Sequence, residues 1–313
     1  MKGLELAKKY YLEYGAPMIK EQFPELEGVI AVGLAGSGSE CLGYDDDLST
    51  DHDFEPGFCM FIPGEDMIDA KNEFLLERAY AKLPREFMGY SRSATSAVGE
   101  KRHGVIRIGD FFERRVGVAD GELSTTDWFS IPEHALAEAV GGEIFRDDLG
   151  MLTDIRNRLS SMPQDVKLKK LAGHLLLMAQ SGQYNYGRCV SRGETGAAQL
   201  AVIEFVKSTM QVIFLLNDKY MPYYKWSFRA LGELDKFSEL TYSLEYLISS
   251  ENTEENSTLK ANMIEDIAGL IITELQARSL TDAICTDLEK HAYSVNDRIS
   301  DNNIRNKNIF YAV

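Results

Sequence analysis

Two aspartates separated by one residue, Asp51 and Asp53, carry the clearest chemical signal in this sequence. Side chains alternate across a β-strand, so a strand that begins here places both carboxylates on one face and His52 on the other. Two carboxylates at this spacing repel each other unless a cation lies between them. Mg²⁺ binds one or two carboxylates and completes its coordination with phosphate oxygens and water. The pair therefore predicts a magnesium site.

A loop rich in glycine and serine precedes the two aspartates, and its central residues are Ser37, Gly38 and Ser39. Glycine lets the backbone approach a phosphate closely, and successive N–H groups form a concave anion site. A serine hydroxyl adds a further hydrogen-bond donor. These three residues are therefore candidate ligands for the phosphates of a nucleotide.

Three phosphate-binding patterns compete for this loop. The P-loop pattern fails, because Ser39 stands where its lysine should follow Gly38. A dinucleotide-binding pattern could start at Gly33, with Asp53 as the ribose-binding acid. That acid should end the second strand, however, whereas Asp53 opens it, and Gly43 interrupts the helix that should follow the glycines. A nucleotidyltransferase loop needs Gly-Ser at the end of one strand and Asp-x-Asp at the start of the next, and both are present.

Hydrophobic patterns indicate the elements that must position these residues. Short apolar runs are typical of buried strands, and they occur at 28–35, 58–62 (a strand beginning near His52) and 105–108. Helical periodicity is found at 2–22, 65–82, 132–140 and 150–160. In the helix at 65–82 the apolar face is expected to hold Met67, Ala70, Phe74, Leu75 and Ala79. Asp147 or Asp148 is expected to cap the helix at 150–160.

The pattern changes at about residue 165, after which long helical periodicity dominates. The predicted helices are 165–182, 195–219, 237–250 and 258–278. The sequence therefore predicts an α+β protein whose N-terminal part is of α/β type. A small mixed-sheet nucleotidyltransferase domain is expected over residues 1–160, followed by an all-α helical bundle domain over residues 161–313.

Composition limits the classes of partner. The chain of 313 residues has 33 basic and 49 acidic side chains, giving a net charge of −16, which would repel a nucleic-acid duplex. Nucleic acid is therefore not an expected partner. We find neither a run of 18 apolar residues nor an apolar signal sequence, so we expect a cytoplasmic protein without a membrane span. The spacing of the four cysteines matches no zinc or redox motif.

The chain resembles the nucleotidyltransferase superfamily, of which kanamycin nucleotidyltransferase is a member. The resemblance rests on Gly38-Ser39, Gly43 and the stretch Ser49-Thr-Asp-His-Asp53. More closely, the chain resembles an uncharacterised branch, the domain-of-unknown-function family numbered 4037. The residues that carry this second resemblance are Ser49–Asp53, Asp127-Trp128 with Pro132, Gly142–Asp147, Gly187-Arg188 and Tyr220–Trp226.

The resemblance implies that Asp51 and Asp53 hold the metal and that Gly38-Ser39 binds phosphate, with Gly36-Ser37 as the alternative register. Active members carry a third carboxylate on a later strand, where it binds metal or takes a proton from the attacking hydroxyl. The run at 105–108 contains no acid. Asp110 is the nearest candidate and Glu113 the next, and either can instead be a solvated loop acid.

Related enzymes often offer a basic residue from the helical domain to the triphosphate. Lys225 and Arg188 are the candidates here, each with a surface cation as the alternative interpretation. Tyr220, Tyr223, Tyr224 and Trp226 could stack on a base, although aromatic residues at a domain junction more often serve packing. His103 precedes the third strand and could reach the edge of the cleft, but a surface histidine is the expected interpretation. Asp45, Asp46 and Asp47 are expected to be solvated, with one of them capping a turn.

These observations favour a Mg²⁺-dependent nucleotidyltransferase that moves a nucleoside monophosphate, AMP from ATP, to a hydroxyl of a small-molecule or protein acceptor. The expected cofactors are Mg²⁺ and a nucleoside triphosphate, and a homodimer is compatible with the sequence. The alternative is a non-catalytic nucleotide-binding regulatory protein with the same fold, because the third acid is missing. A weaker third hypothesis is a toxin–antitoxin-type modifier of proteins or RNA ends.

Overall fold

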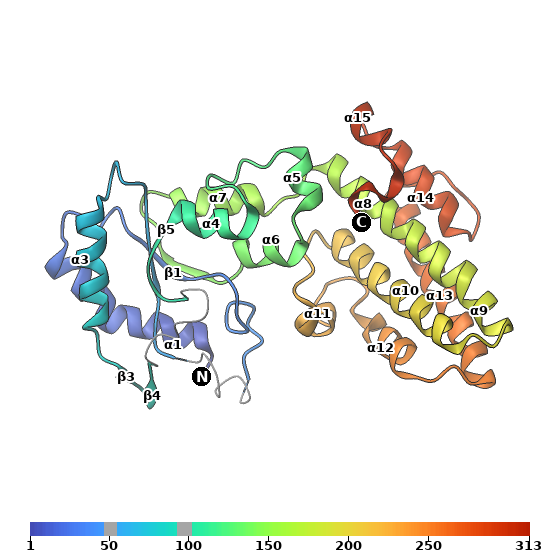
Figure 1. The fold of residues 1–313 in the computed structure, drawn as a ribbon, viewed down its shortest axis with the longest axis horizontal. Helices are drawn as coiled ribbons and strands as arrows, with labels where there is room; N and C mark the ends of the chain where they lie inside the picture. The colour runs from blue at the N-terminus through green and yellow to red at the C-terminus, as the bar shows by residue number, and fades with distance from the viewer. Residues whose placement is uncertain (47–54, 93–101) are drawn as a thin grey trace. The chain divides into compact units, whose positions relative to one another are not determined.

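A computed structural model describes residues 1–46, 55–92 and 102–313 of the chain. Its central feature is a four-stranded sheet with strand order β5-β2-β1-β6 (Figure 1). The strands are β1 (Ala31–Leu34), β2 (Cys59–Ile62), β5 (Gly104–Arg107) and β6 (Glu143–Arg146). The α+β class expected from the sequence is confirmed, because a small mixed sheet is combined with many helices.

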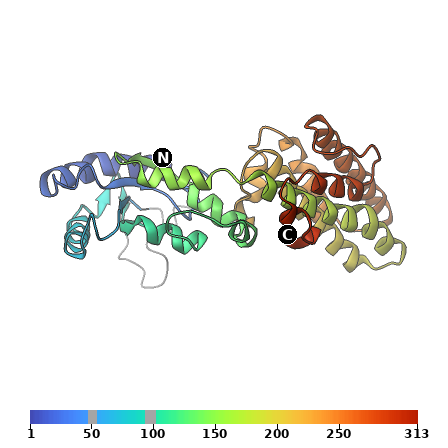
Figure 2. The ribbon, with the colours of Figure 1, turned by 90° about the horizontal axis from the view of Figure 1, so that it is seen from above.

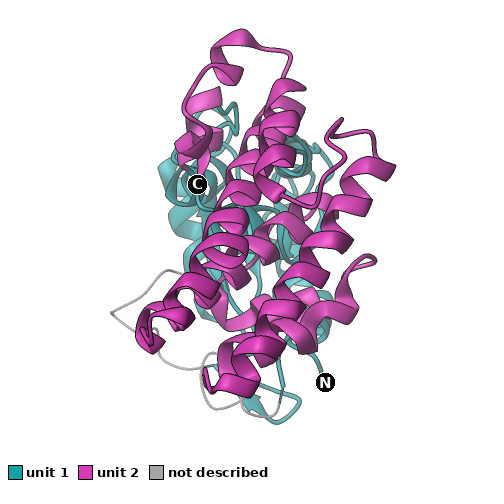
Figure 3. Ribbon diagram, turned by 90° about the vertical axis from the view of Figure 1, so that its right-hand side faces the viewer, with its two compact units in different colours: residues 1–123, 131–161 teal, residues 124–130, 162–313 magenta. Residues whose placement is uncertain are grey.

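The chain divides into two compact units (Figure 3). Unit 1 comprises residues 1–123 and 131–161, and unit 2 comprises residues 124–130 and 162–313. The division expected from the sequence lay after residue 160 and kept 124–130 in the first part. Residues 162–313, all of which the structure describes, form helices and no strand (Figure 2).

Unit 1 surrounds the sheet with helices. Its helical elements are α1 (Gly3–Tyr10), the π-helix η1 (Tyr11–Gly15), α2 (Ala16–Gln22), α3 (Ala70–Ala81), α4 (Ile108–Val116), α6 (Glu133–Val140) and α7 (Met151–Leu159). A small hairpin is formed by β3 (Glu86–Phe87) and β4 (Tyr90–Ser91). The expected helix at 2–22 is thus one continuous helical stretch that ends before Pro24, as the apolar spacing predicted.

The strand pairings bring four chain segments to one edge of the sheet. Strand β1 runs antiparallel to β2, with Gly33 opposite Cys59, and β2 runs parallel to β5, with Cys59 opposite Gly104. Strand β6 is antiparallel to β1, with Leu34 opposite Glu143. The C-terminal end of β1 therefore lies beside the N-terminal ends of β2, β5 and β6. We call this the loop edge, because the glycine-serine loop begins there.

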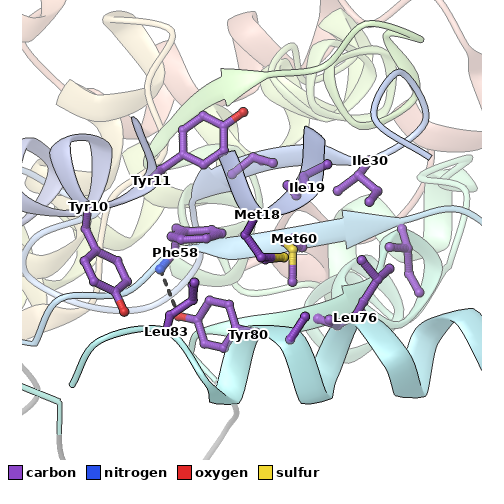
Figure 4. Packing of buried hydrophobic residues seen from close by; sticks show 14 of the residues in the cluster. Tyr10, Tyr11, Met18, Ile19, Ile30, Phe58, Met60, Leu76, Tyr80 and Leu83 are labelled. Carbon is purple, nitrogen blue, oxygen red and sulfur yellow. Dashed lines mark hydrogen bonds between the residues drawn. The ribbon is translucent and has the colours of Figure 1, made fainter. Parts of the chain in front are cut away.

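An aromatic core fixes the N-terminal helices and α3 against the sheet (Figure 4). Phe58 lies between Tyr10 and Tyr11, with ring centroids 5.9 and 5.3 Å away, and its ring meets Tyr80 edge-on at 5.1 Å. The N–H of Phe58 donates to the Tyr80 hydroxyl at 3.2 Å. Burial raises the pKa of Tyr80, so this hydroxyl stays protonated. The segment that leads into β2 is therefore held rigidly by its last residue.

The apolar face expected for the helix at 65–82 is wrong for four of its five residues, since only Ala79 is buried. Phe74 is 59% exposed, and Met67 and Leu75 are also exposed, whereas Leu76 and Tyr80 are buried in the core. Helix α3 begins only at Ala70, with Asp69 as its N-cap, which accepts the N–H of Asn72 at 2.8 Å.

Glycine at position 142 is required by the pairing of β1 with β6. Gly142 has φ +79°, a left-handed conformation that glycine adopts without strain. A Cβ atom on Gly142 would collide with the carbonyl oxygen of Leu34 and lie 2.7 Å from Cα of Ala35. Its N–H donates to the carbonyl of Cys41 at 2.9 Å. The strand β6, which the sequence analysis missed, thus reaches the loop edge through this glycine.

Gly142→Ala is expected to destabilise the protein by about 2–4 kcal/mol, because it adds a backbone collision to the left-handed strain. Gly117→Ala is the matched control, since Gly117 has φ +76° and open space around the position of its Cβ. The control should lose only about 1–2 kcal/mol. Urea unfolding followed by circular dichroism measures both. Equal losses in the two variants would show that the close approach at Gly142 is unimportant.

Unit 2 is a helical bundle. Its elements are α5 (Thr125–Ser130), α8 (Gln164–Met178), the π-helix η3 (Ala179–Tyr186), α9 (Gly187–Ser191), α10 (Thr195–Leu216), α11 (Tyr224–Leu231), the 3₁₀-helix η4 (Ser238–Leu240), α12 (Thr241–Ser249), α13 (Glu254–Ala277), α14 (Leu288–Asp297), α15 (Asn302–Arg305) and the 3₁₀-helix η5 (Ile309–Ala312). The helix α10 packs against α8, η3 and α12. It is long and apolar enough to cross a membrane, but 67% of its most apolar window is buried within the protein, as in a core helix.

A buried lysine ties the C-terminus of the chain to α8. Lys169 is fully buried, and its ammonium donates to Oδ1 of Asn296 at 2.8 Å and to the carbonyls of Arg305 and Lys307 at 3.2 and 2.7 Å. Burial lowers the pKa of Lys169, and three oxygen acceptors compensate for the lost hydration. The C-terminal segment is therefore an integral part of the bundle.

His174 on α8 makes the stability of the protein depend on pH. Burial, followed by the charges of Lys170 and Lys207, lowers the pKa of His174 to about 3, and its Nδ1 is buried without a hydrogen-bond partner among the residues described. In the unfolded chain His174 is protonated below about pH 6.5, whereas in the folded protein it stays neutral there. The free energy of unfolding therefore falls as the pH drops below about 6.5.

We expect the loss to reach about 1–2 kcal/mol at pH 5 relative to pH 7. A His174→Gln protein should lose this part of the pH dependence, whatever its own stability, because glutamine does not titrate. Unfolding by urea at the two pH values gives the difference for each protein. An unchanged difference in the variant would contradict the assignment.

Candidate functional site

The glycine-serine loop forms a sharp bend directly after β1. Gly36 and Gly38 have φ values of +113° and +127°, a backbone conformation that residues other than glycine rarely adopt. The N–H of Tyr44 donates to the carbonyl of Ser39 at 2.8 Å, which closes the loop. The candidate phosphate ligands Ser37, Gly38 and Ser39 therefore lie on one tight bend at the loop edge.

Arg102 lies against this bend. Its guanidinium donates to the carbonyl of Ser37 at 3.1 Å and forms an ion pair with Glu40, which is itself buried. A Cβ atom on Gly38 would collide with the same guanidinium. Arg102 immediately precedes His103 and β5, and the parallel pairing of β5 with β2 brings it to the loop edge. Because Gly38 has no side chain, the guanidinium of Arg102 fits against the bend.

A second arginine lies against the other glycine of the bend. The guanidinium of Arg115, on the last turn of α4, would be 2.5 Å from a Cβ on Gly36. Its Cζ lies 3.9 Å from the ring centroid of Phe111, and its Nη1 donates to the Phe111 carbonyl at 2.9 Å. Arginine presents several N–H donors in a plane that suits phosphate oxygens. Two guanidinium groups therefore border the bend.

An acid of the aspartate run holds the end of the loop. Asp45 is only 4% exposed, and its Oδ2 accepts the N–H of Gly3, the first residue of α1, at 2.8 Å. The ammonium of Lys2 lies 3.6 Å from Oδ1 of Asp45. A carboxylate at a helix N-terminus is favoured by the helix dipole. The expectation that the run is solvated is wrong for Asp45, which is buried and accepts an N–H of α1 rather than one of its own turn.

His103 and Glu55 form a pair at the same edge. Nδ1 of His103 lies 3.2 Å from Oε1 of Glu55, and the two side chains are 10% and 19% exposed. The His103 ring packs on Gly57, where a Cβ would be 2.7 Å from its Cγ. The expectation of a surface histidine is therefore wrong. Gly57 leaves the space that the imidazole fills, and the pairing of β5 with β2 directs residue 103 to this position.

Asp51 and Asp53 lie outside the described residues, as does His52. The start of the second strand is a correction: β2 begins at Cys59, not near His52, and residues 55–58 are irregular. Pro56 has no N–H to donate to a neighbouring strand, which accounts for the late start. The alternation argument for the two aspartates therefore stays a prediction. Among the described residues, His, Cys, Asp and Glu form no group of three suited to a metal.

The candidate third acids lie on α4. Asp110 is exposed in the first turn of this helix, and Glu113 is exposed one turn later. An acid in the first turn complements the helix dipole, which is sufficient to explain Asp110 without a catalytic role. The strand β5 itself has the sequence Gly-Val-Ile-Arg and contains no acid.

The two candidate cations of the helical part lie in unit 2, and both are exposed. The guanidinium of Arg188, on α9, lies 4.6 Å from the ring centroid of Tyr184 and donates to its hydroxyl. The ammonium of Lys225, on α11, lies 4.9 Å from the Trp226 ring centroid. Both cations thus lie over aromatic rings of their own helices or of the turn before them.

The exposed aromatic residues near Lys225 form a small cluster. Tyr224 is 75% exposed, and its ring centroid lies 4.3 Å from that of Tyr223. Arg229 lies over the Trp226 ring, 5.2 Å from the centroid. The exposure of both tyrosines differs from the burial expected of aromatic residues that serve packing.

The sheet topology excludes one of the phosphate-binding patterns considered for the loop. In a dinucleotide-binding fold the glycine loop connects two parallel strands through a helix. Here β1 and β2 are antiparallel, and Gly33 is not in the loop but within β1, opposite Cys59. Gly33 is needed for close strand approach, because its Cβ would lie 2.6 Å from the carbonyl oxygen of Glu143. The dinucleotide pattern is therefore excluded.

The model of the family described as Domain of unknown function (DUF4037) matches residues 128–227, about a third of the chain. The matched region begins in α5 and extends through α6, β6 and α7 to α11. It contains the stretches Gly142–Asp147, Gly187-Arg188 and Tyr220–Trp226, on which the resemblance to this family rests. Comparisons with curated proteins and with solved structures found no match to the chain.

Proposed function

We propose that this protein is a Mg²⁺-dependent nucleotidyltransferase that moves AMP from ATP to a hydroxyl of a small-molecule or protein acceptor. The observation that carries the proposal is the glycine bend after β1, bordered by the guanidinium groups of Arg102 and Arg115. Backbone N–H groups and guanidinium groups together suit a polyphosphate. The mixed sheet and the helical bundle fit the superfamily that the sequence resembles.

The described residues fit the triphosphate rather than the base. Gly36 and Gly38 have no side chains, so the guanidinium groups of Arg115 and Arg102 lie directly against the backbone of the bend. Ser37 and Ser39 add hydroxyl donors on the same bend. Arg115 and Arg102 supply positive charge beside it. This chain thereby orients the α-phosphate for in-line attack by the acceptor hydroxyl.

Asp51 and Asp53 would hold the metal in this proposal. They precede Glu55, at the loop edge, by four and two residues in the chain. When bound, Mg²⁺ supplies charge stabilisation to the phosphates as pyrophosphate leaves. The metal ion held by the carboxylate pair and the guanidinium groups beside the bend would then both bring positive charge to the triphosphate.

A non-catalytic nucleotide-binding regulatory protein is the second candidate. The observation that favours it is the absence of an acid from β5, together with the exposed position of Asp110 on α4. Such a protein would use the same bend to bind ATP, without transfer. The two candidates share the ligand and differ only in the fate of its α–β phosphate bond.

The test is incubation with ATP labelled at the α-phosphate, Mg²⁺ and a panel of hydroxyl acceptors. The enzyme is expected to release pyrophosphate and to leave the labelled α-phosphate on an acceptor, with no activity in excess EDTA. Calorimetric binding of ATP in the presence of Mg²⁺ without pyrophosphate release would favour the regulatory protein. Absence of both binding and release would reject the two candidates together.

A further inference from the structure

The pair formed by His103 and Glu55 has the geometry of a base and its orienting group. A neutral imidazole carries one proton, and the carboxylate of Glu55, 3.2 Å from Nδ1, holds that proton on Nδ1. The other ring nitrogen, Nε2, then carries a lone pair. No hydrogen bond to this nitrogen occurs among the residues that the structure describes. A histidine with one nitrogen bonded to a carboxylate and the other open is suited to accept a proton.

Packing fixes the direction of the imidazole. The ring lies on Gly57, which leaves no room for a Cβ atom, and residue 104 is paired with Cys59 in the sheet. The next residue along β2 in the N-terminal direction is Phe58, which is fully buried and bonded to Tyr80. The imidazole is therefore held by a residue that directly precedes a paired strand and by its packing on Gly57. A base must be held in this way to act within a defined geometry.

The position of the pair relates it to the proposed reaction. His103 follows Arg102, whose guanidinium borders the glycine bend, and Glu55 follows the Asp-x-Asp stretch by one intervening residue. Within residues 1–46, 55–92 and 102–313, Glu55 is bonded to the imidazole, and the neighbouring Arg102 contacts Glu40 and Ser37. The pair therefore stands at the loop edge, where β5 offers no carboxylate of its own.

We propose that His103 is the general base of the nucleotidyl transfer and that Glu55 is its positioning residue. This inference rests on the proposed function. His103 Nε2 accepts the proton of the acceptor hydroxyl as the acceptor oxygen forms its bond to the α-phosphorus. The bond between the α-phosphorus and the bridging oxygen breaks, and pyrophosphate leaves with the electron pair. The imidazolium is stabilised by the carboxylate of Glu55 and returns its proton to water.

The test uses the full-length protein with ATP, Mg²⁺ and glycerol as the probe hydroxyl. His103→Ala is expected to lower kcat for pyrophosphate release by about 10²-fold or more, with KM for ATP within about twofold of the wild type. Free imidazole should restore the rate of this variant, because it can enter the space left by the side chain. The restored rate should follow the concentration of the unprotonated form of imidazole.

Glu55 provides the second, independent variant. Glu55→Gln keeps the shape of the side chain, but its amide can donate to Nδ1 and so place the imidazole proton on Nε2. It should lower kcat by about 10²-fold and shift the pH dependence of kcat, whereas Glu55→Asp, which keeps the charge, should retain more activity than Glu55→Gln. A purely structural ion pair would lose stability in these variants without a change of pH profile.

The outcomes separate the base from the function itself. If the wild type releases pyrophosphate and His103→Ala retains its kcat, or folds and is not rescued by imidazole, the assignment of the base is overturned and the nucleotidyltransferase remains. If His103→Ala does not fold, an unaltered pH profile of Glu55→Gln overturns the assignment. If the wild type releases no pyrophosphate, both the proposed function and the assignment of His103 as the general base are rejected.

Discussion

Asp53→Asn protein is expected to release pyrophosphate from ATP on the order of 10³-fold more slowly than the wild type. Asparagine matches aspartate in shape but brings no negative charge, so it is a poor ligand for Mg²⁺. The transfer depends on that charge, because the metal would balance the charge on the triphosphate. Steady-state measurement of pyrophosphate release at saturating Mg²⁺ gives the ratio. Asp51→Asn should show a loss of similar size, since the two side chains are proposed to share one ion.

Asp66→Asn is the matched control for these variants. Asp66 is exposed on the turn that follows β2, at the opposite edge of the sheet from the glycine bend. Its replacement changes the net charge by the same amount and should leave the rate within about twofold of the wild type. Full activity of both Asp51→Asn and Asp53→Asn would remove the metal site from the proposal. A loss of activity in Asp66→Asn as well would indicate a general effect of charge.

Arg115→Met is expected to raise the dissociation constant of ATP with Mg²⁺ by about 10- to 100-fold, which corresponds to the loss of one charge-assisted hydrogen bond. Methionine keeps an unbranched apolar side chain but removes the guanidinium, which lies over the Phe111 ring and beside Gly36. The affinity for ATP should fall because, among the described contacts, Arg102 would then be the one remaining cation beside the bend. Isothermal titration calorimetry measures the change directly.

Arg114→Met is the control that tests position rather than charge. Arg114 stands next to Arg115 on the last turn of α4, but its side chain is exposed. Its removal lowers the net charge equally and should change the dissociation constant by no more than about twofold at moderate salt. Equal weakening in the two variants would mean that the overall field of α4, and not a contact at the bend, attracts the nucleotide.

The sequence predicted those parts of the fold that have a strong hydrophobic signal. The apolar runs that became β1, β2 and β5 were recognised because buried strands between two layers have few polar residues. The strand β6, with the sequence Glu-Ile-Phe-Arg, was missed because it is half-buried and its polar ends give no continuous run. The helix α4 was missed because it begins at Ile108, directly after β5, without an intervening turn signal.

The candidate site was predictable only in its backbone. Glycine and serine spacing indicated the bend, because the conformations at Gly36 and Gly38 depend on local chain geometry. Arg102 and Arg115 were missed, because an arginine has no sequence signature for the loop against which it packs. A partial signal was present in their positions, on either side of the strand predicted next to the site. The pairing of His103 with Glu55 joins residues 48 apart in the chain and needed the sheet register.

The short helix α5 has a consequence for any dissection of this protein. Residues 124–130 belong to unit 2, although the chain before and after them belongs to unit 1. The polypeptide thus passes between the units three times, at 123–124, 130–131 and 161–162. A fragment ending at residue 161 would carry Phe129 without Tyr311, whose ring it meets at 5.5 Å. A single cut in the chain therefore yields neither unit in complete form. Replacement of 124–130 by a short polar linker in a fragment ending at residue 161 offers a way to isolate the sheet-containing unit.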